Sequence, residues 1–454
     1  MVEPDAAAVR HGPPGPFVRR WAPRFVAFGE FIDGYDLLVV GAALLFLKPD
    51  LHLTAAQTGW IGAISFVGTA VGLVVFGDLS DRFGRRVIFL VNLAFFVVAS
   101  IASAFVTDVP QLLVARFVVG VAVGMDIPTS ASLLAEIAPS ARRGRMSGSL
   151  PNVMWQCGAI TSVLLALALA PVFGNGTWRL LFGVAALPAF AVLLVRQLLP
   201  ESPRWLRSKG RHEEASRVFA QLGIPEPPPA PARSRRDYRE LLRRRTFVRL
   251  AAVTGFFALQ SFGGGVATVS GPLVLDSTGI GREHALYFSL AGYVGGLIAV
   301  LVGALLIDRV SRRALGIWTC IGVFLAGECL AWLGPRAAAV LIVCYVAYSV
   351  LTWLGPGVLS WVWSAEVFPT HLRGLGSGIA QCVTRLSIAL NVVLIPVLLA
   401  DLKLTTIALY ACAYLLAALI VAASPFLATT GRSLEAISGG HDRAPVEAVR
   451  EQGG

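Results

Sequence analysis

The stretch GDLSDRFGRR, residues 77–86, carries five charged side chains and lies between two long apolar runs. Its arginines and its two aspartates can form ion pairs with one another and interact with the ends of the neighbouring helices. A loop that only set membrane topology would need the arginines but not the aspartates. We therefore interpret this stretch as a charged latch at the cytoplasmic ends of two membrane-spanning helices.

The apolar runs on either side of the latch belong to a series that continues along the chain. Of the 454 residues, 56% are hydrophobic and only 14% are charged, whereas a soluble domain has about 25% charged residues. A membrane span needs roughly 20 apolar residues, and lipid-exposed backbone must be helical or closed into a barrel. The sequence predicts an all-α integral membrane protein with twelve spans at 22–47, 56–76, 87–106, 110–136, 147–172, 178–199, 247–275, 285–307, 314–333, 337–364, 374–400 and 404–428.

The positive charge of the chain alternates between loops. The net charge is +11, and its arginines gather in every second loop, as in Arg82, Arg85 and Arg86 after the second predicted span. By the positive-inside rule, these loops and both termini are cytoplasmic. The pattern predicts a multi-pass protein of a bacterial-type inner membrane, with the lipid bilayer as partner and no nucleic acid.

A polar segment divides the spans into two sets of six. We expect an N-terminal tail at 1–21, a six-helix bundle at 22–199, a cytoplasmic linker with short helices at 200–246, a second bundle at 247–428 and a C-terminal tail at 429–454. The halves repeat one another: EIAPSARRG at 136–144 matches EVFPTHLRG at 366–374, and GALLIDRVSRR at 303–313 echoes the latch. Such duplication is typical of transporters with a site between two halves.

The repeated motifs extend the latch to both halves. Its predicted members are Gly77, Asp78, Asp81, Arg82, Arg85, Arg86, Glu136, Arg143, Asp308, Arg309, Arg312, Arg313, Glu366 and Arg373.

Together with PESPRWL at 200–206, these motifs resemble the major facilitator superfamily, most closely its sugar-porter-like branch of metabolite and proton symporters. The resemblance covers nearly the whole chain. It implies two pseudo-symmetric six-helix bundles that work by alternating access.

Ionisable residues inside the predicted spans are candidates for function, because charge within a bilayer is costly unless it is paired or hydrated. The first span contains EFIDGYD, which places Asp33 and Asp36 on one helix face, and the fourth contains Arg116. Burial raises the proton affinity of a carboxylate and a nearby arginine lowers it. Movement of Arg116 relative to Asp36 would thus couple proton binding to conformational change; the alternative is a permanent structural ion pair. The family resemblance implies the same pair, and we add Asp33 as a further proton-coupling candidate.

The predicted substrate site collects polar and aromatic residues from several spans: Asp126, Asn152, Gln156, Gln260, Trp361 and Arg385. An indole suits the apolar face of a sugar ring, and Trp361 matches the family's pocket tryptophan. Arg385 either binds an anionic substrate or pairs with an internal carboxylate such as Asp33 or Asp126.

No nucleophile and base stand in a catalytic arrangement, and the histidines lack metal-ligand spacing. We expect no enzyme activity, no cofactor and no metal. The predicted function is import of a small polar metabolite, sugar-like or a small organic acid, by proton symport in a monomer. Two alternatives remain: a proton-antiporting exporter of a drug or metabolite, and a transporter-like membrane sensor.

Overall fold

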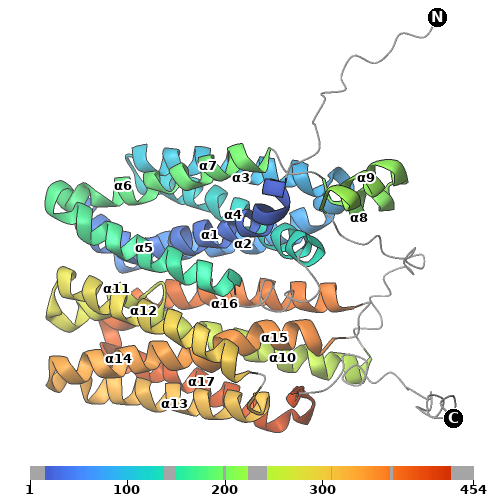
Figure 1. Ribbon diagram of the computed structural model, residues 1–454. Coiled ribbons are helices and arrows are strands. Elements are labelled where there is room, and N and C mark those ends of the chain that lie inside the picture. Colours follow the sequence, from blue (N-terminus) through green and yellow to red (C-terminus); the bar gives the residue numbers. More distant parts are fainter. Residues whose placement is uncertain are drawn as a thin grey trace, which may run out of the picture. The chain divides into compact units, whose positions relative to one another are not determined.

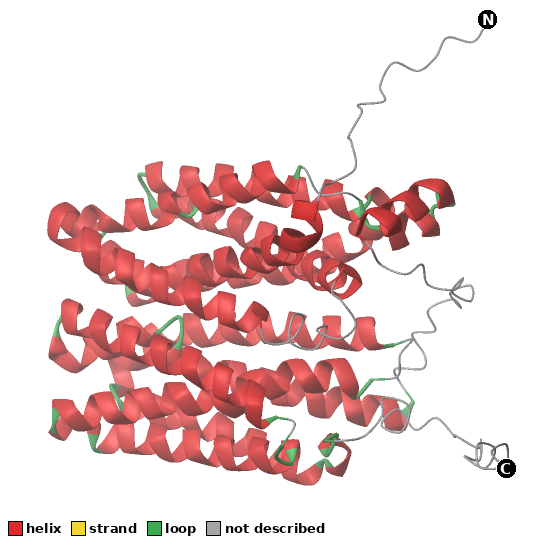
Figure 2. Ribbon diagram, viewed as in Figure 1, coloured by secondary structure: helices red, strands yellow, loops and turns green. Residues whose placement is uncertain are grey.

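The computed structural model describes residues 16–137, 150–197, 201–222, 243–307, 309–368 and 372–430. Nearly all of them lie in helices, and no strand occurs within these ranges (Figure 2). The α-helices are α1 Pro16–Asp50, α2 Ala55–Phe83, α3 Arg85–Phe105, α4 Val109–Ile137, α5 Leu150–Phe173, α6 Thr177–Val184, α7 Ala186–Arg196, α8 Pro203–Ser208, α9 His212–Leu222, α10 Arg244–Gly264, α11 Gly271–Leu275, α12 Arg282–Leu306, α13 Arg312–Trp332, α14 Ala338–Thr352, α15 Val358–Glu366, α16 Arg373–Leu402 and α17 Thr405–Ala423.

Ten helical stretches of the described residues are long and apolar enough to cross a membrane. One of them, Leu150–Arg196, runs for 47 residues through α5, α6 and α7 and covers most of two predicted spans, 147–172 and 178–199. Helix α1 is not among the ten, and its middle carries Glu30, Asp33 and Asp36. One stretch therefore corresponds to two predicted spans and α1 to one more, which reconciles the ten stretches with the twelve predicted spans.

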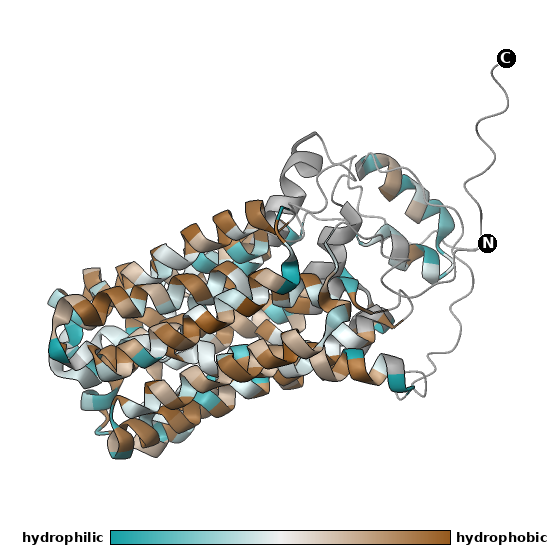
Figure 3. Ribbon diagram, turned by 90° about the horizontal axis from the view of Figure 1, so that it is seen from below, coloured by the Kyte–Doolittle hydropathy of each residue, from teal (hydrophilic) through white to brown (hydrophobic). Residues whose placement is uncertain are grey.

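The helices carry apolar side chains on their outer surfaces and polar ones inside. Val98, Phe105, Val114 and Trp318 are each more than 60% exposed, whereas Asp36 and Arg116 are 0% exposed. Hydrophobic residues follow the long helices along their length (Figure 3). This distribution suits a protein whose surroundings are hydrocarbon.

Short sequence signals fix where several helices begin. Thr54 and Gln57 form a capping box ahead of α2, because the Thr54 hydroxyl accepts from the Gln57 N–H at 3.2 Å and the Gln57 side chain accepts from the Thr54 N–H at 3.0 Å. Asp108 caps α4 by accepting from the Gln111 N–H at 2.8 Å. Gly84 separates α2 from α3 with a φ of 100°, a conformation that favours glycine.

The chain forms two compact units. The first comprises the described residues of 1–232 with Val269–Tyr293 and Val392–Val397. In it α2 packs along α4, α1 packs along α5, and α3 lies against α4, α6 and α7 (Figure 1). This packing brings charged residues of α1, α4 and α7 into one interior.

The second unit comprises the described residues of 233–268, 294–391 and 398–454. In it α17 packs against α13 and α10, and α13 packs against α14. Its helices are interrupted where glycine and proline accumulate: α10 ends at Gly264, and α14 passes into a π-helical turn, Trp353–Gly357, that contains Pro356.

Candidate functional site: two buried ion pairs

A bidentate ion pair joins α1 to α4 inside the first unit. Arg116 donates from Nη1 to Asp36 Oδ1 at 2.8 Å and from Nη2 to Asp36 Oδ2 at 2.7 Å. Nη2 also donates to the backbone carbonyl of Asp36 at 3.1 Å. Both side chains are 0% exposed. The two residues predicted to carry proton coupling are therefore in direct contact.

Neighbouring side chains hold this pair in place. The Arg116 guanidinium lies 4.7 Å from the centre of the Phe182 ring, in cation–π contact. Ser65 on α2 donates its hydroxyl to the Arg116 carbonyl at 3.0 Å, and Tyr35, next to Asp36, donates to the Leu181 carbonyl at 2.8 Å. Both side chains are fully buried, so each charge depends strongly on the other.

A second buried ion pair in the same unit joins α4 to α7. Arg196 donates from Nη1 to Asp126 Oδ1 at 2.7 Å, and Asn92 on α3 donates its amide to the same oxygen at 2.8 Å. The guanidinium lies 4.3 Å from the centre of the Phe89 ring. Asp126, predicted as a substrate ligand, is thus engaged by residues of its own unit.

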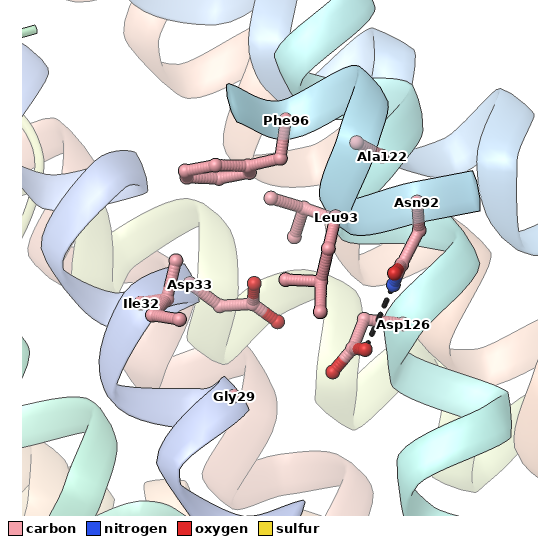
Figure 4. Close-up of a pocket in the computed structure, with 9 residues that line it drawn as sticks. Gly29, Ile32, Asp33, Asn92, Leu93, Phe96, Ala122 and Asp126 are labelled. Carbon is pink, nitrogen blue, oxygen red and sulfur yellow. Dashed lines mark hydrogen bonds between the residues drawn. The ribbon is translucent and has the colours of Figure 1, made fainter. Parts of the chain in front are cut away.

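A small cavity adjoins the second pair. Asp33, Asn92 and Asp126 line it, together with Gly29 on α1. The carboxylates of Asp33 and Asp126 point into it from different helices (Figure 4). Asp33 shares this cavity with Asp126, and its neighbour one turn away, Asp36, binds Arg116 instead.

Helix α5 contributes two of the predicted substrate residues. Asn152 is 8% exposed and Gln156 is 0% exposed. Within the described structure neither the oxygen nor the nitrogen of the Gln156 amide has a hydrogen-bond partner. Buried amides are normally satisfied, so Gln156 is suited to receive a polar ligand or water.

The remaining substrate candidates belong to the second unit. Gln260 on α10 is partly buried and donates to the neighbouring Ser261 hydroxyl at 2.8 Å. Trp361 on α15 is partly exposed, whereas Trp363 is buried and donates its indole N–H to the Leu427 carbonyl at 3.0 Å. Arg385 on α16 is 5% exposed.

In the first unit, the latch region contacts a residue of the PESPRWL motif. Glu201 accepts from the backbone N–H of Arg85 at 3.0 Å, from that of Arg86 at 3.2 Å and from that of Ser202 at 2.8 Å. Arg86 also donates its side chain to the Gln197 carbonyl at 2.6 Å. A carboxylate at the N-terminus of α3 stabilises that helix end.

In the second unit, two predicted latch residues form an ion pair. Arg312 contacts Glu366 and donates to the Thr429 hydroxyl at 3.0 Å. Arg313 donates from Nε to the Val421 carbonyl at 3.2 Å, and Arg309 is exposed.

Other predicted latch residues fall partly or wholly outside the described structure. Arg143 and Asp308 lie outside the described residues, and only the helical backbone is described for Gly77, Asp78, Asp81, Glu136 and Arg373. Arg82 lies in the last turn of α2, and its side chain is exposed.

Sequence reasoning missed three residues that shape these sites. Arg196 and Asn92 bind Asp126, and Glu201 caps α3. Arg196 and Asn92 lie inside the predicted spans 178–199 and 87–106, so a search for every polar group within a span would have found them. The sequence pointed to Glu201 only as a member of the PESPRWL motif, not as a helix cap.

Comparison with known proteins gives consistent matches along the chain. A family model described as "Sugar (and other) transporter" matches residues 24–439. The major myo-inositol transporter of Bacillus subtilis is 30% identical over 84% of this chain and 85% of its own length. The D-xylose transporter of Levilactobacillus brevis is 28% identical over 79% of this chain and 82% of its own length.

Solved structures share the fold. The xylose transporter XylE from E. coli, in a partially occluded inward-open conformation, matches with a TM-score of 0.76 at 21% identity, covering 90% of this chain and 98% of that one. Another XylE structure is that of a major facilitator superfamily proton:xylose symporter, and it matches with a TM-score of 0.73.

Proposed function

Because this chain belongs to the sugar (and other) transporter family of the major facilitator superfamily, we propose that it imports a small polar metabolite by proton symport. The family places the chain among multi-pass membrane transporters, which are not enzymes, with twelve helices in two bundles. Import and proton coupling are the steps that we add.

The observation that carries the proposal is the buried Asp36–Arg116 pair. A carboxylate beside a guanidinium stays ionised, and a buried carboxylate without its cation binds a proton readily. A conformational change that withdraws Arg116 from Asp36 therefore raises the proton affinity of Asp36, and its return expels the proton. Both oxygens of Asp36 bind Arg116. The Asp36 carboxylate therefore binds either the proton or the guanidinium, but not both at once.

For the substrate we propose a sugar-like compound or a small organic acid, bound by Asn152, Gln156, Gln260, Trp361 and Arg385. The unsatisfied, buried amide of Gln156 supports a ligand with hydroxyl groups. Relatives named for D-xylose and myo-inositol transport support the same chemistry. Arg385 would bind the carboxylate of an acid.

We further propose a monomer in a bacterial inner membrane, with both termini cytoplasmic and the arginine-rich loops inside. The charged latch would hold the cytoplasmic side closed in one state and release it in the other. The ion pair between Arg312 and Glu366 supports a latch function for the motif in the second unit.

The test uses purified full-length protein in liposomes. A thermal-shift screen over sugars, polyols and small organic acids identifies a ligand, which is then labelled. We expect counterflow of this compound and its uphill uptake when the outside is made acidic. Accumulation driven by the opposite gradient would support the antiporting exporter, and binding without counterflow would support the sensor; either result contradicts the proposal.

A further inference from the structure

The cavity beside the second ion pair brings together two carboxylates from different helices. Asp33 comes from α1 and Asp126 from α4, and both are 4% exposed. Figure 4 shows their carboxylates directed toward the same space, with Asn92 joined to Asp126 at one side. The space has room for about one water molecule and is far too small for a metabolite.

Two buried polar atoms near this cavity have no hydrogen-bond partner within the described structure. They are Oδ1 of Asn92, which is 2% exposed, and Nη2 of Arg196, whose side chain is 1% exposed. A Cβ added at Gly29 would lie 2.8 Å from Nη2 of Arg196 and 2.8 Å from Oδ2 of Asp126. Gly29, Asn92 and Asp126 line the cavity and Arg196 does not, so Nη2 of Arg196 lies beside a lining residue rather than in the cavity wall.

These groups match the requirements of a bound water that carries a proton. A buried water needs two to four polar partners, and the cavity is lined by carboxylates from two helices and by Asn92, whose amide oxygen has no partner within the described structure. Two carboxylates that face one such space repel each other when both are ionised, and a shared proton removes the repulsion.

The charged residues on the surrounding helices are few. Among the described side chains, α1 carries Glu30, Asp33 and Asp36 in its middle, with Asp36 bound to Arg116, and Lys48 and Asp50 at its end. On α4 they are Arg116 and Asp126, on α7 Arg196, and on α3 Arg85 and Arg86 at its first turn. Arg19, Arg20 and Arg24 of α1 and Glu136 of α4 lie outside the described side chains. Arg196 binds Asp126 and offsets the charge of that carboxylate.

We infer that Asp33 and Asp126 form a second proton-binding site, distinct from Asp36, in which one proton is shared through a water held by Asn92. The proton arrives from water and its uptake reduces the charge of the two carboxylates from −2 to −1. Arg196 is a positioning residue that also limits how readily the site takes up the proton. The inference concerns proton binding by the protein itself and does not require the proposed function.

The test is a pH titration of purified full-length protein followed by infrared difference spectroscopy in the carboxylic-acid C=O region. We expect two buried carboxyl transitions in the wild type. Asp36→Asn should remove one and leave the other, whereas Asp33→Asn should remove the other alone. Asp108→Asn is the matched control, because Asp108 is exposed and its loss should leave both transitions unchanged.

Arg196→Gln tests the role of the guanidinium. Loss of a cation within contact distance should move the second transition to higher pH by about one to three units. Arg196→Lys returns the positive charge and should bring the transition most of the way back to its wild-type pH. The neutral double variant Asp126→Asn/Arg196→Gln leaves no unpaired charge from this pair, so it protects the test against misfolding; it should lack the shared-proton signal. The inference would be overturned if the wild type showed a single transition and Asp36→Asn abolished it. It would also be overturned if a second transition persisted in both Asp33→Asn and the double variant. Either result would leave proton coupling at Asp36 intact.

Discussion

The first unit contains two carboxylate–guanidinium pairs that differ in how fully their hydrogen bonds are met. In the Asp36–Arg116 pair, each carboxylate oxygen accepts from a different nitrogen. In the Asp126–Arg196 pair, Arg196 and Asn92 both donate to Oδ1, and Nη2 of Arg196 has no hydrogen-bond partner within the described structure. The same two residue types thus form a closed pair on one side and an open pair on the other.

The difference lies in the further polar residues of the second site. Phe182 faces Arg116 and Phe89 faces Arg196, so both guanidiniums stack on an aromatic ring. The second site adds Asn92, which occupies Oδ1 together with Arg196, and Asp33, which faces Asp126 across the cavity. A closed pair can change only by separation of its partners, whereas an open one can bind a small ligand without separating.

The largest expected effect separates the two pairs by stability. Arg116→Met leaves Asp36 as a buried carboxylate without its bidentate partner, and breaking such a pair costs about 3–5 kcal/mol. Arg196→Met should cost less, because Asn92 still donates to Asp126. Thermal unfolding of the purified variants measures both, with exposed Arg309→Met as the control. A greater loss for Arg196→Met would contradict the distinction between closed and open pairs.

A steric change next to the acids of α1 is expected to have an intermediate effect. A Cβ at Gly34 would lie 2.3 Å from the Trp155 carbonyl oxygen, so Gly34→Ala forces the backbones of α1 and α5 apart. We expect a loss of about 1–3 kcal/mol, as for overpacking elsewhere. At Gly29 a Cβ would meet only the ends of the Arg196 and Asp126 side chains.

Gly29→Ala should therefore alter the open pair with a smaller loss of stability. Comparing the thermal unfolding of the two glycine variants measures the difference. Equal losses would show that the Arg196 and Asp126 side chains are as rigid as backbone.

A smaller effect is expected at the N-terminus of α3, the helix that carries Phe89 and Asn92. Glu201→Ala removes the acceptor of the Arg85 and Arg86 N–H groups, and loss of a helix cap costs about 1 kcal/mol. Glu201→Gln keeps an acceptor and should lose less. If unfolding temperatures of both variants equal that of the wild type, the cap contributes nothing.

The smallest effect concerns Asp276, an acid outside the spans. Partial burial raises the pKa of Asp276, although Lys48 and Arg282 lower it. An acid whose folded pKa is raised favours the protonated form, so its ionisation lowers stability as pH rises from its usual range through the raised value. Asp276→Asn should therefore stabilise slightly at neutral pH and not at acid pH, as unfolding temperatures at the two pH values would show. Stabilisation of the variant at acid pH but not at neutral pH would contradict this prediction.

The fold was predictable because the length of each apolar run can be read directly from the sequence. Eleven predicted spans overlap apolar helical stretches, and the remaining one coincides with most of α1. The interruptions were not predicted: the span 247–275 is split between α10 and α11, and α14 is separated from α15 by the turn at 353–357. Gly263–Gly265 and Pro356 marked both places, but hydropathy alone does not register a break in a helix.

The site was predictable only where two charges stood out. Asp36 and Arg116 lie deep inside spans, so an ion pair between them followed from the cost of isolated charge. Arg196 lies near the end of its span, where it resembles the arginines of a cytoplasmic loop, and its pairing with Asp126 depends on how α4 and α7 pack around α3. Side-chain partners set by such packing are not encoded in local pattern.

The most direct test of the account is a comparison of wild type and Asp36→Asn in liposomes, with the ligand found by the stability screen. Asparagine keeps the shape of the side chain but cannot exchange a proton. We predict that Asp36→Asn retains counterflow and loses uphill uptake driven by an acidic exterior, while exposed Asp108→Asn behaves as wild type. Undiminished accumulation by Asp36→Asn would contradict the claim that the Asp36–Arg116 pair couples the proton to transport.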